Sequence, residues 1–233
     1  MITISNLKKQ FGETCACDIQ SFTVNDGDIL GLVGNNGAGK TTLFRLLLDL
    51  LQTDGGSVEI DGINPAESEA WKNDVGSYID DGFLIDFLTP EEYFSFLGKI
   101  SGMKQEEVDE RLKDFERFAG GEIFGQKKLI RNLSAGNKQK VGVISALLRK
   151  PKTVILDEPF NFLDPTSQLV LKQLITDYAK ETGSTIIISS HNLQHTVEIS
   201  TRIALLEHGQ IIRDLPNEEG SATVELQEYF AAE

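Results

Sequence analysis

Residues 34 to 41 read Gly-Asn-Asn-Gly-Ala-Gly-Lys-Thr and satisfy the pattern G-x-x-x-x-G-K-S/T. Glycines in such a segment let backbone N–H groups turn toward phosphate oxygens, and a helix N-terminus adds partial positive charge. Lys40 is placed to reach the β and γ phosphates of a nucleotide, and the Thr41 hydroxyl to complete the shell of a Mg²⁺ ion. We therefore expect a nucleotide phosphate site made of Gly34, Asn35, Asn36, Gly37, Ala38, Gly39, Lys40, Thr41 and Thr42.

A pair of acidic residues, Asp157 and Glu158, follows the apolar run 153–156. Phosphoryl transfer needs a carboxylate on the metal and a group that orients or deprotonates water. We expect Asp157 to hold Mg²⁺, directly or through water, and Glu158 to act as the general base or to polarise the attacking water. An acidic pair at a strand end equally fits a plain N-cap of the next helix, so this assignment depends on the phosphate-binding segment.

Short apolar runs and turns predict the elements that hold these residues. Strands are expected at 3–4, 22–24, 29–33, 57–60, 153–156, 185–188 and 203–206, and helices near 40–51, 168–180 and 226–233. Continuous apolar strands that alternate with helices indicate a parallel sheet with both faces covered. Between Phe87 and Leu148, helical spacing and mixed charge replace this pattern. The chain is therefore expected to be an α/β protein with a helical insertion.

The composition excludes several classes of protein. The 233 residues carry 22 Lys and Arg against 36 Asp and Glu, a net charge of 22 − 36 = −14. This charge argues against non-specific nucleic-acid binding, which needs clustered cations. No apolar stretch approaches the roughly 18–20 residues that span a bilayer, and the N-terminus does not resemble a signal peptide, which favours a cytoplasmic protein. Cys15 and Cys17 are expected to be inert strand residues in a reducing compartment.

Residues 133–140, Leu-Ser-Ala-Gly-Asn-Lys-Gln-Lys, resemble the LSGGQ signature of the ABC ATPase family, and the resemblance extends across nearly the whole chain. It implies a P-loop NTPase core with a mostly parallel sheet, an N-terminal antiparallel β subdomain and an inserted helical subdomain. The chain 1–233 would then be a single ABC-type nucleotide-binding domain, with a core of 1–86 and 150–233 and a helical subdomain of 87–149. Ala135 and Asn137 replace the usual glycine and glutamine. In isolation, the segment also fits a helix N-cap at Ser134.

Three other segments resemble motifs of the family. Residues 161–164, Asn-Phe-Leu-Asp, are similar to the D-loop, which crosses the dimer interface. His191 follows two serines and is similar to the H-loop histidine that meets the γ-phosphate. The alternatives for His191 are a plain strand-end histidine and a zinc site shared with His195. Phe11 is similar to the aromatic residue that stacks on adenine, although a core phenylalanine fits the same pattern.

Residues 75–81 depart most clearly from the family. They fall where a strand usually ends in glutamine, and here Asp80, or alternatively Asp81, takes that position. A carboxylate can still coordinate Mg²⁺, although it reaches less far and adds negative charge beside the phosphates. Because similar acidic residues occur among exporter-type members, we interpret Asp80 as a metal ligand and not as a sign of lost activity.

The resemblance further implies an ATPase that uses ATP and Mg²⁺. Its catalytic residues are implied to be Lys40, Glu158 and His191, and its signature contacts with ATP are implied to be Ser134, Gly136 and Asn137. The signature of one domain caps the ATP bound to another, so the family's mechanism implies a homodimer, or a heterodimer with a related ABC ATPase subunit, arranged head to tail. A separate integral-membrane permease would hold the protein on the inner face of the cell membrane, and the acidic residue at position 80 leans toward an exporter.

Two other functions fit the same residues. A soluble ABC ATPase that drives assembly or remodelling, for example of iron–sulfur clusters, would share the catalytic residues and differ in its docking surface. A nucleotide sensor that does not hydrolyse ATP is disfavoured because Lys40, Glu158 and His191 are present together. Lys40 and Ser134 are 134 − 40 = 94 positions apart, which leaves no room for the long coiled coil of chromosome-maintenance relatives. The transporter subunit is the function that we expect.

Overall fold

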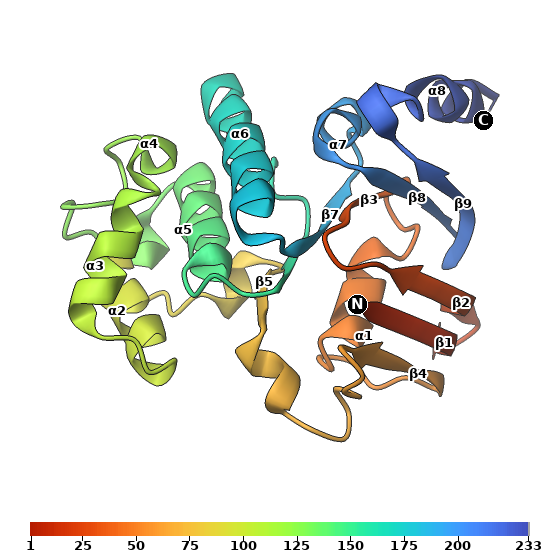
Figure 1. Ribbon diagram of the computed structural model, residues 1–233, viewed down its shortest axis with the longest axis horizontal. Helices are drawn as coiled ribbons and strands as arrows, with labels where there is room; N and C mark the ends of the chain where they lie inside the picture. The colour runs from red at the N-terminus through yellow and green to blue at the C-terminus, as the bar shows by residue number, and fades with distance from the viewer. Residues whose placement is uncertain (233) are drawn as a thin grey trace.

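The apolar runs of the sequence form two sheets in the computed structural model, which describes residues 1–232. The strands are β1 (Ile2–Phe11), β2 (Thr14–Val24), β3 (Ile29–Val33), β4 (Gly55–Ile60), β5 (Val75–Tyr78), β6 (Thr153–Leu156), β7 (Thr185–Ser190), β8 (Arg202–Glu207) and β9 (Gln210–Pro216). The α-helices are α1 (Lys40–Leu47), α2 (Pro90–Ile100), α3 (Gln105–Lys113), α4 (Glu116–Ala119), α5 (Ala135–Leu147), α6 (Pro165–Thr182), α7 (Leu193–Ile199) and α8 (Thr223–Ala232). Figure 1 shows β1, β2 and β4 at one end of the molecule and α2, α3 and α4 at the other.

The larger sheet has six strands in the order β5-β6-β7-β3-β8-β9. Neighbouring strands run parallel from β5 to β8, and β9 returns antiparallel to β8. The smaller sheet is antiparallel, with three strands in the order β2-β1-β4. The mostly parallel core and the N-terminal antiparallel sheet are therefore confirmed, whereas β9 was not predicted from the sequence.

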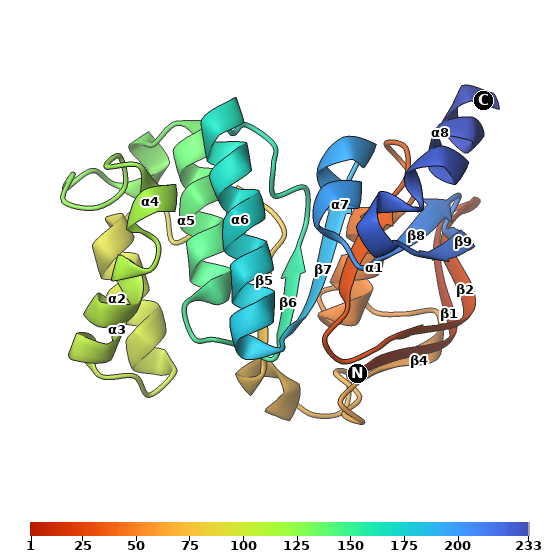
Figure 2. The same cartoon turned by 45° about the horizontal axis from the view of Figure 1, so that its top comes forward.

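Helix α1 lies between the two sheets, and Figure 2 shows this layer from a second side. Ile155 and Ile187 of the larger sheet belong to the apolar cluster that contains Phe44 of α1 and the inner side chains of the smaller sheet. Their neighbours along the strands, Val154 and Ile186, belong to the cluster formed with α5 and α6. Alternate residues of a strand point to opposite faces, so a continuous apolar run fills two layers at once.

The first and last of the expected helices have other boundaries than the sequence predicted. The helix expected at 40–51 ends at Leu47, because Asp49 adopts a φ of 51° and turns the chain before the apolar residues that follow. The helix expected at 226–233 begins at Thr223, and Glu233 lies outside the described residues.

Helix α6 is longer than the expected 168–180 because both of its ends are well capped. Asp164 accepts a hydrogen bond from the Ser167 amide at its start, and Gly183 ends it with a φ of 68°. Neither α6, which has 18 residues, nor any other helix in the described part of the chain is both long and apolar enough to cross a membrane.

Candidate functional site

The phosphate loop connects β3 to α1. Strand β3 is buried along all five of its residues, and α1 begins at Lys40 without a side-chain cap. Gly39 precedes the helix with a φ of 108°, and a Cβ atom at this position would lie 2.6 Å from the carbonyl oxygen of Ala16. The first amides of a helix have no acceptor within it, so the start of α1 presents N–H donors. These donors and the glycine backbone fit the phosphate chain of ATP.

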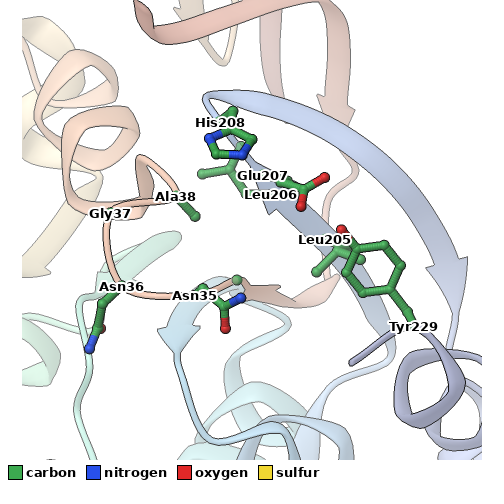
Figure 3. Close-up of a pocket in the computed structure, with 10 residues that line it drawn as sticks. Asn35, Asn36, Gly37, Ala38, Leu205, Leu206, Glu207, His208 and Tyr229 are labelled. Atoms are coloured by element: carbon green, nitrogen blue, oxygen red, sulfur yellow. The ribbon is translucent and has the colours of Figure 1, made fainter. Parts of the chain in front are cut away.

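A turn far along the chain supports this loop. The amide of Gly209, between β8 and β9, donates to the carbonyl oxygen of Ala38 at 2.9 Å. A cavity of about 150 Å³ lies beside the loop. Figure 3 shows Asn35 on one side of it, across from Glu207 of β8 and Tyr229 of α8. The C-terminal strands and helix therefore form the outer wall of the phosphate loop.

Lys40 and Thr41 bring the start of α1 to the acidic end of β6. The Lys40 side chain is buried, and its Nζ lies 2.6 Å from the carbonyl oxygen of Gly34 and 3.5 Å from Oε1 of Glu158. The Thr41 hydroxyl donates to Oδ2 of Asp157. The structure thus joins the two predicted motifs in one contact network.

Asp157 is 6% exposed, and hydroxyl groups surround its carboxylate. Thr41 donates to one oxygen, and Ser189 of β7 donates to the other. Burial raises the pKa of Asp157, and the two hydrogen bonds oppose this effect. A carboxylate beside a hydroxyl offers the oxygen ligands that Mg²⁺ prefers, so this donor set fits the ion.

Glu158 has an uncommon backbone conformation beside His191. Its φ is 46°, its amide donates to Oγ of Ser189 at 2.8 Å, and its carbonyl oxygen accepts from the Gln139 side chain at 3.1 Å. Its Oε2 lies 2.8 Å from Nδ1 of His191 and accepts from the His191 amide at 3.2 Å. A left-handed backbone at a non-glycine residue persists only where the surroundings hold it. Here it directs the carboxylate between His191 and the ammonium group of Lys40.

The signature segment begins α5 and approaches the loop that follows β6. Ser134 caps α5 by accepting from a backbone amide three residues along the chain, at 3.2 Å. A Cβ atom at Gly136 would lie 2.6 Å from the carbonyl oxygen of Phe162, so the glycine permits a close contact between the two segments. Ala135 lines a pocket of about 220 Å³ together with Glu158. The signature segment therefore lies at the edge of the acidic site of its own chain.

Asp80 and Phe11 lie at other edges of the site. Asp80 lines the same pocket as the two carboxylates at the end of β6, and its Oδ2 lies 3.3 Å from Nη2 of Arg45. Phe11 ends β1, is 51% exposed, and has Nζ of Lys9 at 5.6 Å from its ring centroid. Its exposed ring is available for stacking, and stacking on adenine stays a prediction.

The supporting roles of three residues were not predicted from the sequence. Ser189 donates a hydrogen bond to Asp157. Gln139 donates to the carbonyl oxygen of Glu158, and the Gly209 amide donates to the carbonyl oxygen of Ala38 in the phosphate loop. The only local signal is at Ser189, which is next to the last residue of an apolar strand that ends just before His191. The other two residues carry no motif of their own.

The fold and these contacts define a nucleotide-hydrolysing protein of the P-loop class. A family model described as ABC transporter matches residues 17–161. The chain belongs to this family, and it is an ATP-binding subunit with ATPase activity.

Similar proteins support this assignment. The bacitracin transport ATP-binding protein BcrA of Bacillus licheniformis is 36% identical over 93% of this chain and 70% of the relative. The tungstate uptake system ATP-binding protein TupC of Peptoclostridium acidaminophilum is 32% identical over 90% of this chain and 96% of the relative. A solved ATP-binding subunit of an ABC transporter has a TM-score of 0.86 at 23% identity, covering 100% of this chain and 98% of its own. A dimeric ATP-binding cassette, in a post-hydrolysis state with ADP and Pi, has a TM-score of 0.83 at 23% identity, covering 94% and 99%.

Proposed function

We propose that the chain dimerises head to tail around Mg-ATP and powers a separate permease in the membrane. The observation that carries this proposal is the convergence of Lys40, Asp157, Glu158 and His191 at the adjacent ends of β3, β6 and β7. This is where parallel α/β sheets bind their ligands. The proposal gives each group one task in the hydrolysis of ATP.

The phosphates of ATP would bind the amides at the start of α1 and the ammonium group of Lys40. Thr41 and Asp157 would hold Mg²⁺, with Asp80 at the edge of the same pocket. When bound there, the ion neutralises charge on the β and γ phosphates. Glu158 would accept the proton of the attacking water, because its carboxylate is adjacent to the phosphate site.

His191 contacts Glu158 through both its ring and its amide, so it would keep the carboxylate oriented. In the proposed reaction His191 also meets the γ-phosphate from the side of α7. Both contacts from His191 go to Oε2 of Glu158. The other carboxylate oxygen, Oε1, lies 3.5 Å from Nζ of Lys40. The proposed base is thus held between two positively polarised groups.

The second half of each ATP site would come from a second subunit, identical or related. Ser134, Gly136 and Asn137 would contact the ATP that the partner's phosphate loop binds, since they form the capped N-terminus of a 13-residue helix. Phe162, in the adjacent loop, is 74% exposed with a φ of 63°, which supports a contact surface at this point. The similar solved cassette bound to ADP and Pi is itself dimeric.

The permease would bind the helical region, which we propose to be a subdomain of residues 87–149 set on a core of 1–86 and 150–233. Four large apolar side chains, one just before this subdomain and three within it, are exposed, and groups of this kind would suit a protein contact where they form a continuous surface. They are Phe83, Phe87, Phe96 and Ile100. Binding there would hold the protein on the inner face of the cell membrane.

The catalytic assignment is tested with Glu158→Gln. We expect ATP turnover to fall by about 10²–10⁴-fold, because the variant lacks the proton acceptor, while ATP binding persists. Light scattering after size-exclusion chromatography should show a dimer only when ATP and Mg²⁺ are added. Glu181→Gln is the matched control, since Glu181 is exposed and pairs with Lys150. A Glu158→Gln protein that hydrolyses ATP at the parent rate would refute the assignment.

The permease is tested by isolating a tagged copy from detergent-solubilised membranes of the native cell, with identification of partners by mass spectrometry. A polytopic membrane protein in stoichiometric amount supports the proposal. Recovery of soluble proteins alone, with the chain absent from the membrane fraction, would favour an ATPase of assembly or remodelling. We also propose export as the direction, on the basis of Asp80; ATP-driven uptake by inside-out vesicles containing both proteins would support it.

A further inference from the structure

The loop after β5 carries two adjacent carboxylates that pair with different helices. Oδ2 of Asp80 lies 3.3 Å from Nη2 of Arg45 on α1, and Oδ2 of Asp81 lies 3.2 Å from Nζ of Lys138 on α5. The two helices are those that begin with the phosphate loop and with the signature segment. Two neighbouring residues therefore connect the two helices whose N-termini the proposed ATPase site uses.

The two cations lie at different places on their helices. Arg45 is in the last turn of the eight-residue α1, 45 − 40 = 5 positions after its first residue, whereas Lys138 is in the first turns of α5, 138 − 134 = 4 positions after its cap Ser134. A helix is stiff over such a short distance, since a turn takes about 3.6 residues. A displacement of either ion pair is therefore transmitted to the groups at the helix start.

The Asp80 carboxylate has two contacts, one to the Gly82 amide and one to Arg45. Its Oδ1 accepts from the amide of Gly82, two residues further along the chain, at 2.9 Å. Its Oδ2 faces Arg45. The same pocket contains Asp157 and Glu158, so the charge of Asp80 is repelled from that side. Arg45 supplies the opposing attraction that holds the carboxylate at the edge of the pocket.

These ion pairs are too exposed to matter much for stability. The side chains of Arg45 and Asp80 are 45% and 43% exposed, and those of Lys138 and Asp81 are 25% and 57% exposed. Exposed pairs contribute little to folding and weaken as salt is added. Their place between two ATP-binding helices points to a role in the reaction.

We propose that Arg45 is a positioning residue that fixes Asp80, and that Lys138 does the same for Asp81. The pair of carboxylates then keeps the phosphate-loop helix and the signature helix in a fixed position relative to each other. This inference rests on the proposed function, because the relative position matters only if both helices serve ATP hydrolysis.

The test compares Arg45→Gln with Arg45→Lys. The control is Lys150→Gln, which also removes an exposed cation from an ion pair, in this case the pair of Lys150 with Glu181. In Arg45→Gln we expect kcat to fall roughly three- to fivefold, the full worth of an exposed ion pair. The affinity for a fluorescent ATP analogue without Mg²⁺ should stay within about twofold, because the phosphate loop is untouched. Arg45→Lys should recover most of the lost kcat because it keeps the charge.

Two further measurements separate positioning from a structural role. Raising sodium chloride from about 0.1 M to about 1 M shortens the screening length from about 10 Å to about 3 Å. The kcat of the parent, and of Lys150→Gln, should then fall toward that of Arg45→Gln, which should change less. The amide of Gly82 should exchange its hydrogen faster in Arg45→Gln than in the parent or in Lys150→Gln.

The inference is overturned if Arg45→Gln keeps the parent kcat, if Arg45→Lys is no better than Arg45→Gln, or if salt acts equally on both proteins. Failure of the proposed function has a different signature. In that case the parent itself does not hydrolyse ATP, or Glu158→Gln matches it. An active parent, an inactive Glu158→Gln and an unaffected Arg45→Gln would refute the positioning role alone.

Discussion

Replacement of Gly39 by alanine should damage both the stability of the protein and its affinity for ATP. Gly39 has a φ of 108°, and left-handed backbone costs alanine about 1–2 kcal/mol. The added Cβ atom would lie 2.6 Å from the carbonyl oxygen of Ala16. This oxygen belongs to the backbone of β2, and the neighbouring strand residue Asp18 donates its amide to the carbonyl oxygen of Gly209 at 2.8 Å, so relief of the overlap requires backbone to move. Such overlap costs about 1–3 kcal/mol more.

The two costs together lower the free energy of unfolding by about 2–5 kcal/mol, which corresponds to a Tm lower by about 4–20 °C for a protein of this size. The loop must move off β2 to relieve the overlap. Loss of two charge-assisted bonds to phosphate, of about 1.5 kcal/mol each, then raises the Kd for ATP by about 10²-fold. Calorimetric unfolding and titration with a fluorescent ATP analogue measure the two effects.

The matched control is Gly183→Ala at the end of α6. Gly183 has a φ of 68°, but a Cβ atom there meets open space, so only the backbone cost of about 1–2 kcal/mol applies. Its Tm should fall by about 2–8 °C, with unchanged ATP affinity. The reasoning fails if Gly39→Ala loses no more stability than Gly183→Ala and binds ATP as the parent does.

Three more predictions follow from buried polar and titratable groups. Asn217→Ala should lower the free energy of unfolding by about 2–4 kcal/mol, because this buried side chain bonds to two carbonyls and an amide; urea denaturation should show no such loss in Gln173→Ala, an exposed control. Burial lowers the pKa of His195 below its usual 6.5. The contribution of the neutral ring to the free energy of unfolding is therefore complete above pH 6.5 and is lost as the pH falls through the lowered pKa. Thermal scans should find this loss smaller in His195→Gln. Burial raises the pKa of Cys17 to about 12, while Cys15 is exposed, so mass spectrometry after iodoacetamide should find label on Cys15 alone in the native protein; rapid labelling of Cys17 would contradict this.

The parts of the site that could be predicted from the sequence are those carried by contiguous segments. The loop before Lys40 and the pair Asp157-Glu158 each follow an apolar strand directly, so their context can be read locally. The structure brings Lys40 within 3.5 Å of Glu158, as expected for two motifs at the carboxyl ends of strands in one parallel sheet. Apolar runs likewise predicted the parallel strands β3, β6, β7 and β8, since buried strands need no alternation, whereas β5 was indicated only by the family resemblance.

The parts that could not be predicted depend on which strands become neighbours. Ser189 reaches Asp157 because β7 lies beside β6, and Gly209 supports the phosphate loop because β8 lies beside β3. The pairing of Arg45 with Asp80 has the same origin, since it joins two segments that no local pattern connects. The end of α1 was missed for a different reason: the apolar residues after Asp49 continue the helical pattern, and only the backbone turn at that residue ends it.

The strand order has a consequence for how the protein is made. Strand β3 pairs with β7 and β8, which lie within residues 185–207, and Ile29 faces Ile186, which the ribosome adds 186 − 29 = 157 positions later. At about 5–20 residues per second, the delay is roughly 8–30 s. The small antiparallel sheet lies within residues 2–60 and can form long before that. A nascent chain therefore carries the complete phosphate-loop sequence while the apolar strand beneath it still has no partner, and we expect it to bind ATP only after β7 and β8 have been made.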